Sequence, residues 1–94
     1  MMTLEEKRRT RPDIPHTREE FDRWLAWYAD PQNGYAWDFD FRFEMNGHTI
    51  RASGLFRHIC IDNVQHSVND EYCTVIRDGV SYKPTDYIKM KIFG

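Results

Sequence analysis

The sequence predicts a single α+β domain in which one N-terminal helix packs on an antiparallel sheet of four or five strands, as a two-layer sandwich. Three features lead to this prediction: a helix-start motif followed by an apolar stripe, a strictly alternating segment that ends in Asn46-Gly47, and shorter alternating segments nearer the C-terminus. The alternative is a strongly curled sheet or a small open barrel, because the apolar positions change face near Gly54.

The helix is predicted to begin at Thr17. The residues Thr17-Arg18-Glu19-Glu20 form a capping box, in which the threonine hydroxyl accepts a hydrogen bond from the Glu20 amide and the Glu20 carboxylate reaches back to Thr17. Four large apolar residues then share one helix face: Phe21, Trp24, Leu25 and Tyr28. Asp30-Pro31 ends the helix. The apolar face of the helix is expected to pack on a sheet.

The segment from Tyr35 to Met45 predicts a half-buried strand, because aromatic and apolar residues alternate with charged ones. Asn46-Gly47 tolerates the positive φ of a two-residue type I′ turn, so the chain is expected to reverse at once. This turn determines the register of the hairpin. The expected pairs are Met45 with His48, Phe43 with Ile50, Phe41 with Ala52, Phe39 with Gly54, Asp40 with Ser53 and Arg42 with Arg51.

The remainder of the chain predicts a loop, a second hairpin and a final strand. The expected ranges are 62–70 for the loop, 71–77 and 80–83 for the strands around the Asp78-Gly79 turn, and 87–93 for the final strand. In that last segment Ile88, Met90 and Ile92 alternate with lysines. Pro84-Thr85 is interpreted as the break that precedes it.

Length and composition allow one domain. The 94 residues, with 40% hydrophobic and 15% aromatic content, supply a single core. We assign residues 17–94 to that domain and residues 1–16, which mix basic residues with acids and prolines, to a mobile charged arm. A net charge of −2 gives no general attraction to nucleic acid or to anionic membranes. Without a membrane-spanning apolar run or a signal peptide, the expected location is the cytoplasm.

No motif indicates metal or cysteine chemistry. Four residues have types that bind zinc, but they do not form close pairs on tight turns: His58, Cys60, His66 and Cys73. The cysteines lack an accompanying Gly-rich elbow or oxyanion loop, and no disulfide is expected between them. We therefore expect no cofactor, no metal site and no catalytic residues. A small metal-dependent or cysteine enzyme is retained as the third hypothesis.

The first hypothesis is a non-enzymatic protein-binding module. Asp38, Asp40 and Glu44 project from the outer face of the first hairpin strand, and this acidic face suits a protein partner with a basic surface. The chain has the size of a phage or mobile-element accessory protein that inhibits a host or defence protein, an expectation that rests on size and not on a motif. An edge strand would also allow a homodimer.

The second hypothesis is a nucleic-acid-associated regulator. It depends on the basic cluster of the arm, Lys7, Arg8, Arg9 and Arg11, acting together with Lys83, Lys89 and Lys91. Acidic residues flank the cluster, and a solvated terminus is the preferred interpretation. Neither nucleic acid nor a membrane is therefore the expected partner.

Overall fold

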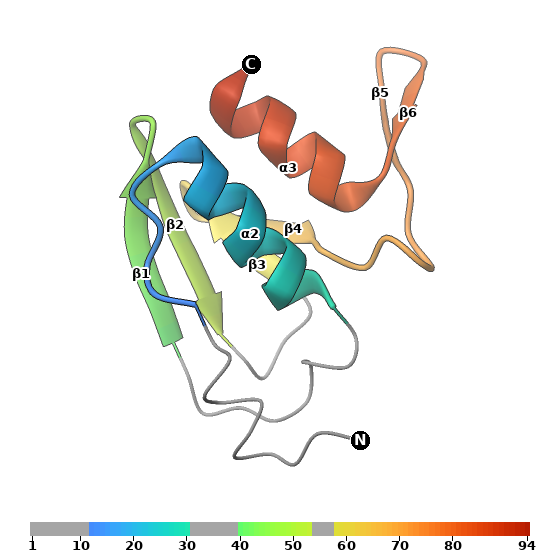
Figure 1. Ribbon diagram of the computed structural model, residues 1–94. Helices are drawn as coiled ribbons and strands as arrows, with labels where there is room; N and C mark the ends of the chain where they lie inside the picture. Colours follow the sequence, from blue (N-terminus) through green and yellow to red (C-terminus); the bar gives the residue numbers. More distant parts are fainter. Residues whose placement is uncertain (1–11, 31–39, 54–57) are drawn as a thin grey trace, which may run out of the picture.

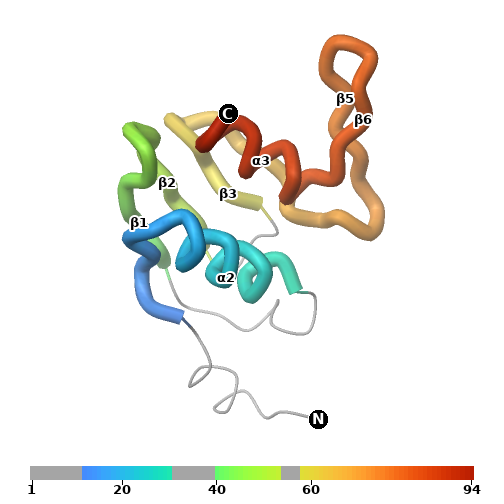
Figure 2. Tube along the Cα trace, turned by 45° about the horizontal axis from the view of Figure 1, so that its top comes forward, coloured from blue at the N-terminus to red at the C-terminus, as the bar shows by residue number. Residues whose placement is uncertain are grey.

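The computed structural model describes residues 12–30, 40–53 and 58–94. The elements in chain order are α2 (Arg18–Ala29), β1 (Asp40–Met45), β2 (His48–Ser53), β3 (His58–Ile61), β4 (Val64–Ser67), β5 (Val75–Arg77), β6 (Val80–Tyr82) and α3 (Pro84–Phe93). Strands β1 to β4 form an antiparallel sheet in sequential order, and β5 and β6 form a separate two-stranded sheet. Both helices lie on one face of the larger sheet, and the β5–β6 hairpin projects beyond α3 (Figure 1, Figure 2).

Helix α2 begins where the capping box predicts. The Glu20 amide donates to Thr17 Oγ1 at 3.1 Å, while the Glu20 carboxylate accepts from the His16 amide at 2.8 Å instead of the Thr17 amide. All four residues of the predicted apolar stripe are buried. The local sequence signals for the start and the inner face of this helix are therefore confirmed.

The first hairpin has the predicted register. Asn46 and Gly47 have φ values of 50° and 82°, and the pairs from Met45–His48 to Asp40–Ser53 are those expected from the turn. The Asn46 side chain has a second role, because its Nδ2 donates to the Ile92 carbonyl at 2.7 Å and joins the turn to the end of α3. The segment 35–39, Gly54 and the expected change of face there lie outside the described residues.

Helix α3 replaces the predicted final strand. The α+β class is confirmed, but the expectation of one helix on a single sheet is wrong. Pro84 occupies the first helical turn, where a missing N–H loses no hydrogen bond. Pro84, Ile88 and Ile92 recur every four residues and are buried, whereas Met90 is 37% exposed. Ile88 and Ile92 fit both the alternating pattern of a strand and the periodicity of a helix. The short alternation therefore did not discriminate between a strand and a helix.

Strand β4 lies where a loop was predicted. Asp62 and Asn63, with φ values of 50° and 69°, make a two-residue turn without glycine. The strand itself is an edge strand, and none of its four residues is buried. It therefore lacks the apolar alternation by which a half-buried strand is recognised.

The core lies between the helices and the inner face of the sheet. Trp24 is fully buried at its centre, with ring-centroid distances of 5.3 Å to Tyr28, 5.4 Å to Phe41 and 5.0 Å to Phe43. The remaining buried members are Phe21, Leu25, Met45, Ile50, Ala52, Ile59, Ile61, Val68, Ile88 and Ile92. The aromatic part of the core is thus formed by α2 and β1, and α3 completes the core.

Residues 12–16 belong to the range predicted as a mobile arm. Pro15 is fully buried, while Ile14 is 41% exposed. Residues 1–11 lie outside the described residues, so the domain boundary at residue 16 stays a prediction. Within the described ranges, neither helix has the length and apolar character needed to cross a membrane.

Candidate protein-binding surfaces

The β5–β6 hairpin stands apart from the four-stranded sheet. Its turn is the predicted one, with Asp78 at φ 53° and Gly79 at φ 77°, and Arg77 pairs with Val80 across it. Each strand has only three residues, shorter than expected. An isolated two-stranded hairpin of this length is marginally stable in water, so its position depends on contacts at its base.

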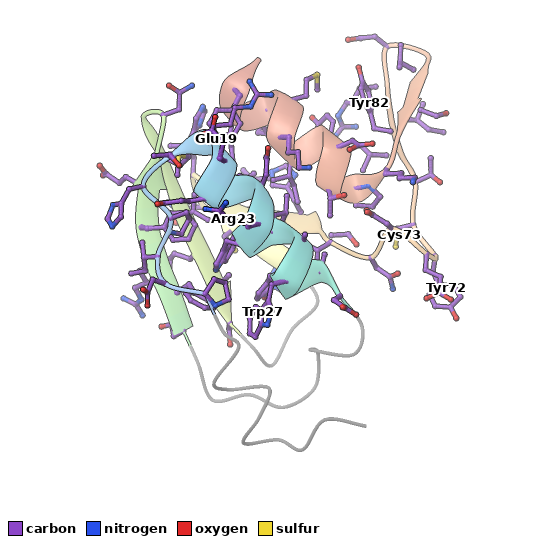
Figure 3. All side chains as sticks on the ribbon, in the orientation of Figure 1. Glu19, Arg23, Trp27, Tyr72, Cys73 and Tyr82 are labelled. Atoms are coloured by element: carbon purple, nitrogen blue, oxygen red, sulfur yellow. The ribbon has the colours of Figure 1, made fainter. Side chains whose placement is uncertain are left out.

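Large apolar side chains on and beside this hairpin are exposed to solvent. The exposed fractions are 80% for Tyr72, 63% for Ile76 and 49% for Val80. Figure 3 shows Tyr72 pointing away from the folded body. Because side chains alternate along a strand, Ile76 lies on one face of the hairpin and Val80 on the other. The exposed side chains therefore lie on both faces of the projecting hairpin and are available for contact with a partner from either side.

Tyr87 of α3 anchors the base of the hairpin. Its ring centroid lies 5.7 Å from that of Tyr82, and the Arg77 guanidinium lies 5.6 Å from the same ring. Arg77 Nε also donates to the Tyr87 hydroxyl at 3.3 Å. On β4, the His66 ring lies 5.9 Å from Tyr87. We call these four residues the Tyr87 cluster; it connects the hairpin to both α3 and the sheet edge.

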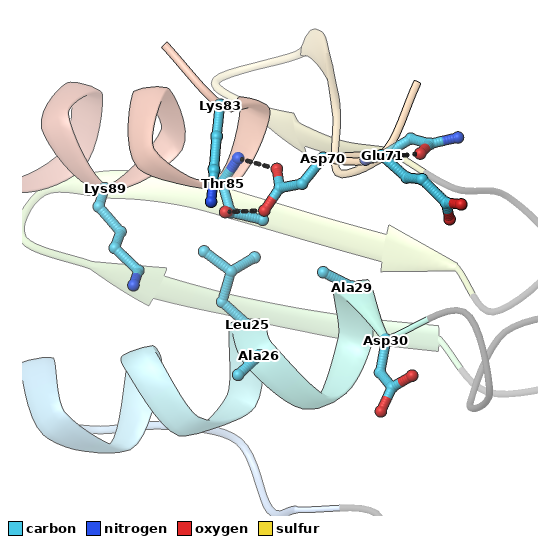
Figure 4. A pocket seen from close by; sticks show the side chains of 10 residues that line it. Leu25, Ala26, Ala29, Asp30, Asp70, Glu71, Lys83, Thr85 and Lys89 are labelled. Atoms are coloured by element: carbon cyan, nitrogen blue, oxygen red, sulfur yellow. Dashed lines mark hydrogen bonds between the residues drawn. The ribbon is translucent and has the colours of Figure 1, made fainter. Parts of the chain in front are cut away.

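Asp70 positions the connection between β4 and β5. Its carboxylate accepts hydrogen bonds from the Thr85 amide at 2.9 Å and the Thr85 hydroxyl at 2.5 Å (Figure 4). The N-cap residue of α3, Lys83, makes no side-chain capping bond. Asp70 therefore supplies, from a distant part of the chain, the acceptor that the first turn of α3 needs.

A cleft of about 540 Å³ lies between α2 and the N-terminal half of α3 (Figure 4). Its lining includes Leu25, Ala26 and Ala29 of α2, and it carries charged groups of both signs. Lys89 Nζ lies 3.9 Å from Asp22 Oδ1. The volume is that of a small-molecule site, but the mixed charges select no single class of ligand.

The predicted acidic partner-binding residues lie on the outer face of the sheet, as far as they are described. Asp40 and Glu44 are exposed on β1, and Asp38 lies outside the described residues. Arg42 Nε donates to Asp40 Oδ2 at 3.1 Å, and Arg51 lies opposite Arg42. The face therefore carries both signs of charge. The binding role of Asp38, Asp40 and Glu44 stays a prediction.

The basic residues of the nucleic-acid hypothesis are not brought together in the described part of the chain. Lys7, Arg8, Arg9 and Arg11 lie outside it. Lys83 precedes α3, and Lys89 and Lys91 lie on that helix, about 200° apart around its axis. They form no single basic stripe.

The side chains considered as zinc ligands do not converge. Ile59 pairs with His66 and Cys60 with Gln65, so Cys60 and His66 lie on opposite faces of the sheet. Cys60 is half-buried and Cys73 is exposed, and both are free thiols. Across residues 12–30, 40–53 and 58–94, no group of three or more His, Cys, Asp or Glu side chains could hold a metal ion.

Within the described ranges, two ionisable groups have displaced pKa values. The hydrogen bond from the Thr49 amide, at 2.9 Å, and then that with His48 Nδ1, at 2.7 Å, lower the pKa of Asp62. Burial, followed by the positive charges of Lys91 and Arg77, lowers the pKa of His66 from 6.5. His66 is therefore neutral at neutral pH, a property that its sequence context did not indicate.

Sequence reasoning assigned the second hairpin to the sheet and missed its exposed apolar residues. One signal was available: Val75 and Ile76 are consecutive apolar residues, which point to opposite faces of a strand and cannot both meet one core. Comparison of the chain with protein-family models, curated proteins and solved structures finds no match. The functional interpretation therefore depends on the geometry of the chain itself.

Proposed function

We propose that this protein is a non-enzymatic protein-binding module that contacts its partner through the β5–β6 hairpin. The observation that carries the proposal is the exposure of Ile76 and Val80, at 63% and 49%, on a projecting hairpin. Within the described chain its strands pair with each other and with no other strand. A partner groove that covers both side chains gains the free energy of burying them, about 1.5–3 kcal/mol for each side chain at full burial.

The backbone of the hairpin adds a second means of recognition. Each strand of a two-stranded sheet is an edge, and an edge strand presents unpaired N–H and C=O groups to an extended segment of a partner. Main-chain pairing would supply affinity, and pockets for Ile76 and Val80 would supply specificity. By covering a surface that a target needs, such a module would act as the inhibitor expected of a phage or mobile-element accessory protein.

Affinity purification of the full chain from its native host tests this proposal. The double variant Ile76→Glu/Val80→Glu is expected to lose the captured partner and to keep its fold, because both side chains are exposed. Val64→Glu is the matched control, since Val64 is 55% exposed on the β4 edge and lies outside the hairpin. It is expected to retain the partner. Circular dichroism checks the fold of each variant.

A second surface variant separates this proposal from the sequence-based prediction. Replacing Asp38, Asp40 and Glu44 together by lysine reverses their charges and leaves the β5–β6 hairpin unaltered. Retention of the partner by this triple variant, with loss by the hairpin variant, supports the hairpin as the interface. The reverse result would move the interface to the outer face of the sheet and reject the hairpin.

A further inference from the structure

His66 lies where the sheet edge, α3 and the hairpin meet. It belongs to β4, and its ring lies 5.9 Å from Tyr87, the residue that holds Arg77 and Tyr82 of the hairpin. Its Nε2 atom is buried and has no hydrogen-bond partner among the residues that the structure describes. A buried ring nitrogen without an acceptor favours the neutral imidazole, because protonation would create a buried N–H donor with no partner.

The charged surroundings of His66 oppose protonation further. The titratable and charged groups that face it are Tyr87 and Lys91 from α3 and Arg77 from β5. Its strand partner on β3 is Ile59, which carries no charge. Among the described residues, no ion pair joins a carboxylate to His66. A proton on this ring would therefore add a third positive charge beside Arg77 and Lys91.

We propose that His66 is a proton-operated switch of the β5–β6 hairpin, whose protonation in mildly acidic solution loosens the Tyr87 cluster and frees the hairpin from α3. Arg77 is the group that transmits the change, because the same guanidinium that senses the His66 charge also contacts the Tyr87 ring and hydroxyl. The loosening is a property of the free protein. Only its consequence, weaker partner binding in acid, rests on the proposed function.

The direction of the pH dependence follows from proton linkage. In the closed arrangement the pKa of His66 is lowered, while in an opened arrangement it returns towards 6.5. The open form then binds the proton more readily, so the closed form is fully favoured above pH 6.5 and loses this advantage as the pH falls below it. Below pH 6.5, each unit by which the pH falls shifts the equilibrium between the closed and open forms towards the open form by up to about tenfold.

Nuclear magnetic resonance of the full chain tests the switch without a partner. Between about pH 7.5 and about pH 5, the wild-type protein is expected to lose the NOE between the Tyr82 and Tyr87 rings and the exchange protection of the hairpin amides, after correction for intrinsic rates. His66→Phe keeps an aromatic ring against Tyr87 but cannot titrate, so it is expected to retain both signals. His16→Gln, at an exposed histidine, is the control and is expected to behave as the wild type.

Three results would overturn the switch: an equal pH response in His66→Phe, an unchanged NOE in the wild type, or direct titration of the His66 ring at or above pH 6.5. The direct titration needs no variant, so it decides even where His66→Phe fails to fold. The switch and the proposed function fail separately. Loosening of the hairpin in acid, with capture retained by Ile76→Glu/Val80→Glu, would leave the switch in place and reject the hairpin as the interface.

Discussion

Replacing Asp70 tests whether a tertiary contact, and not the local sequence, determines helix α3. Asp70 lies in the connection after β4 and accepts two hydrogen bonds from Thr85, in the first turn of the helix. The local N-cap residue, Lys83, makes no side-chain capping bond. Asp70→Ala removes both acceptor oxygens and the negative charge. The connection between β4 and β5 keeps its length, because only the side chain changes.

The expected cost combines two effects. Loss of a capping acceptor costs about 1 kcal/mol, and loss of a negative charge near a helix N-terminus costs about 0.3–1 kcal/mol. Asp70→Ala should therefore lower the free energy of unfolding by about 1.3–2 kcal/mol, which corresponds to a fall in Tm of roughly 5–16 °C for a domain of this size. Asp70→Asn removes the charge but keeps one oxygen to accept from the Thr85 amide, and its NH2 group can donate to the Thr85 hydroxyl, so it should cost about half as much or less.

Urea denaturation followed by far-UV circular dichroism measures these differences. Glu71→Ala is the matched control, because Glu71 is an adjacent exposed acid whose carboxylate does not contact Thr85. A double-mutant cycle with Thr85→Ala measures the part of the stabilisation that comes from the hydrogen bond between Asp70 and the Thr85 hydroxyl. An Asp70→Ala protein within about 0.5 kcal/mol of the wild type, or a Glu71→Ala protein destabilised as much, would refute the assignment of Asp70 as the cap.

Two further predictions concern the first hairpin and the acidic limb of stability. Asn46→Gly keeps a residue that tolerates the positive φ but loses the hydrogen bond to the Ile92 carbonyl, so its urea midpoint should fall by the equivalent of about 1 kcal/mol. The midpoint of Asn46→Ala should fall further, because alanine does not tolerate the positive φ. A urea midpoint of Asn46→Gly equal to that of the wild type would contradict the contact with α3. The pKa of Asp62 is lowered in the folded state, so its contribution is present above pH 3.8 and is lost as the pH falls through the folded pKa. Urea midpoints measured from neutral to acid pH should therefore decline less steeply in Asp62→Asn than in the wild type, and identical slopes would count against the Asp62 contacts with Thr49 and His48.

Local signals predicted the parts of the fold whose interactions are themselves local. Thr17 and Glu20 lie three residues apart, and the Asn46-Gly47 and Asp78-Gly79 turns each join strands that follow at once. In these cases the residues that decide the structure are close in the sequence, so a short motif contains the whole interaction. The apolar stripe of α2 belongs to the same class, because its period is a property of the helix alone.

The candidate site was predicted much less well than the fold. The sequence showed that Ile76 and Val80 are apolar strand residues, but not that the hairpin leaves the sheet and exposes them. It also placed Asp40 and Glu44 on an outer face, where the structure shows them beside Arg42 and Arg51. Whether an apolar side chain is covered or exposed depends on elements packed from elsewhere in the chain, which no window of neighbouring residues contains.

The sequence by itself determined the α+β class, the start of α2, the register of the first hairpin and the position of the second turn. The tertiary structure alone decided that residues 84–93 are helical, because burial of Ile88 and Ile92 under one helix face and the Asp70 cap outweigh a short alternation that a strand would share. It also decided that the half-buried His66 ring, with its buried Nε2 atom, lies near Arg77 and Lys91, since these residues come from three different elements. Contacts between distant segments carry the free energy that settles such ambiguities.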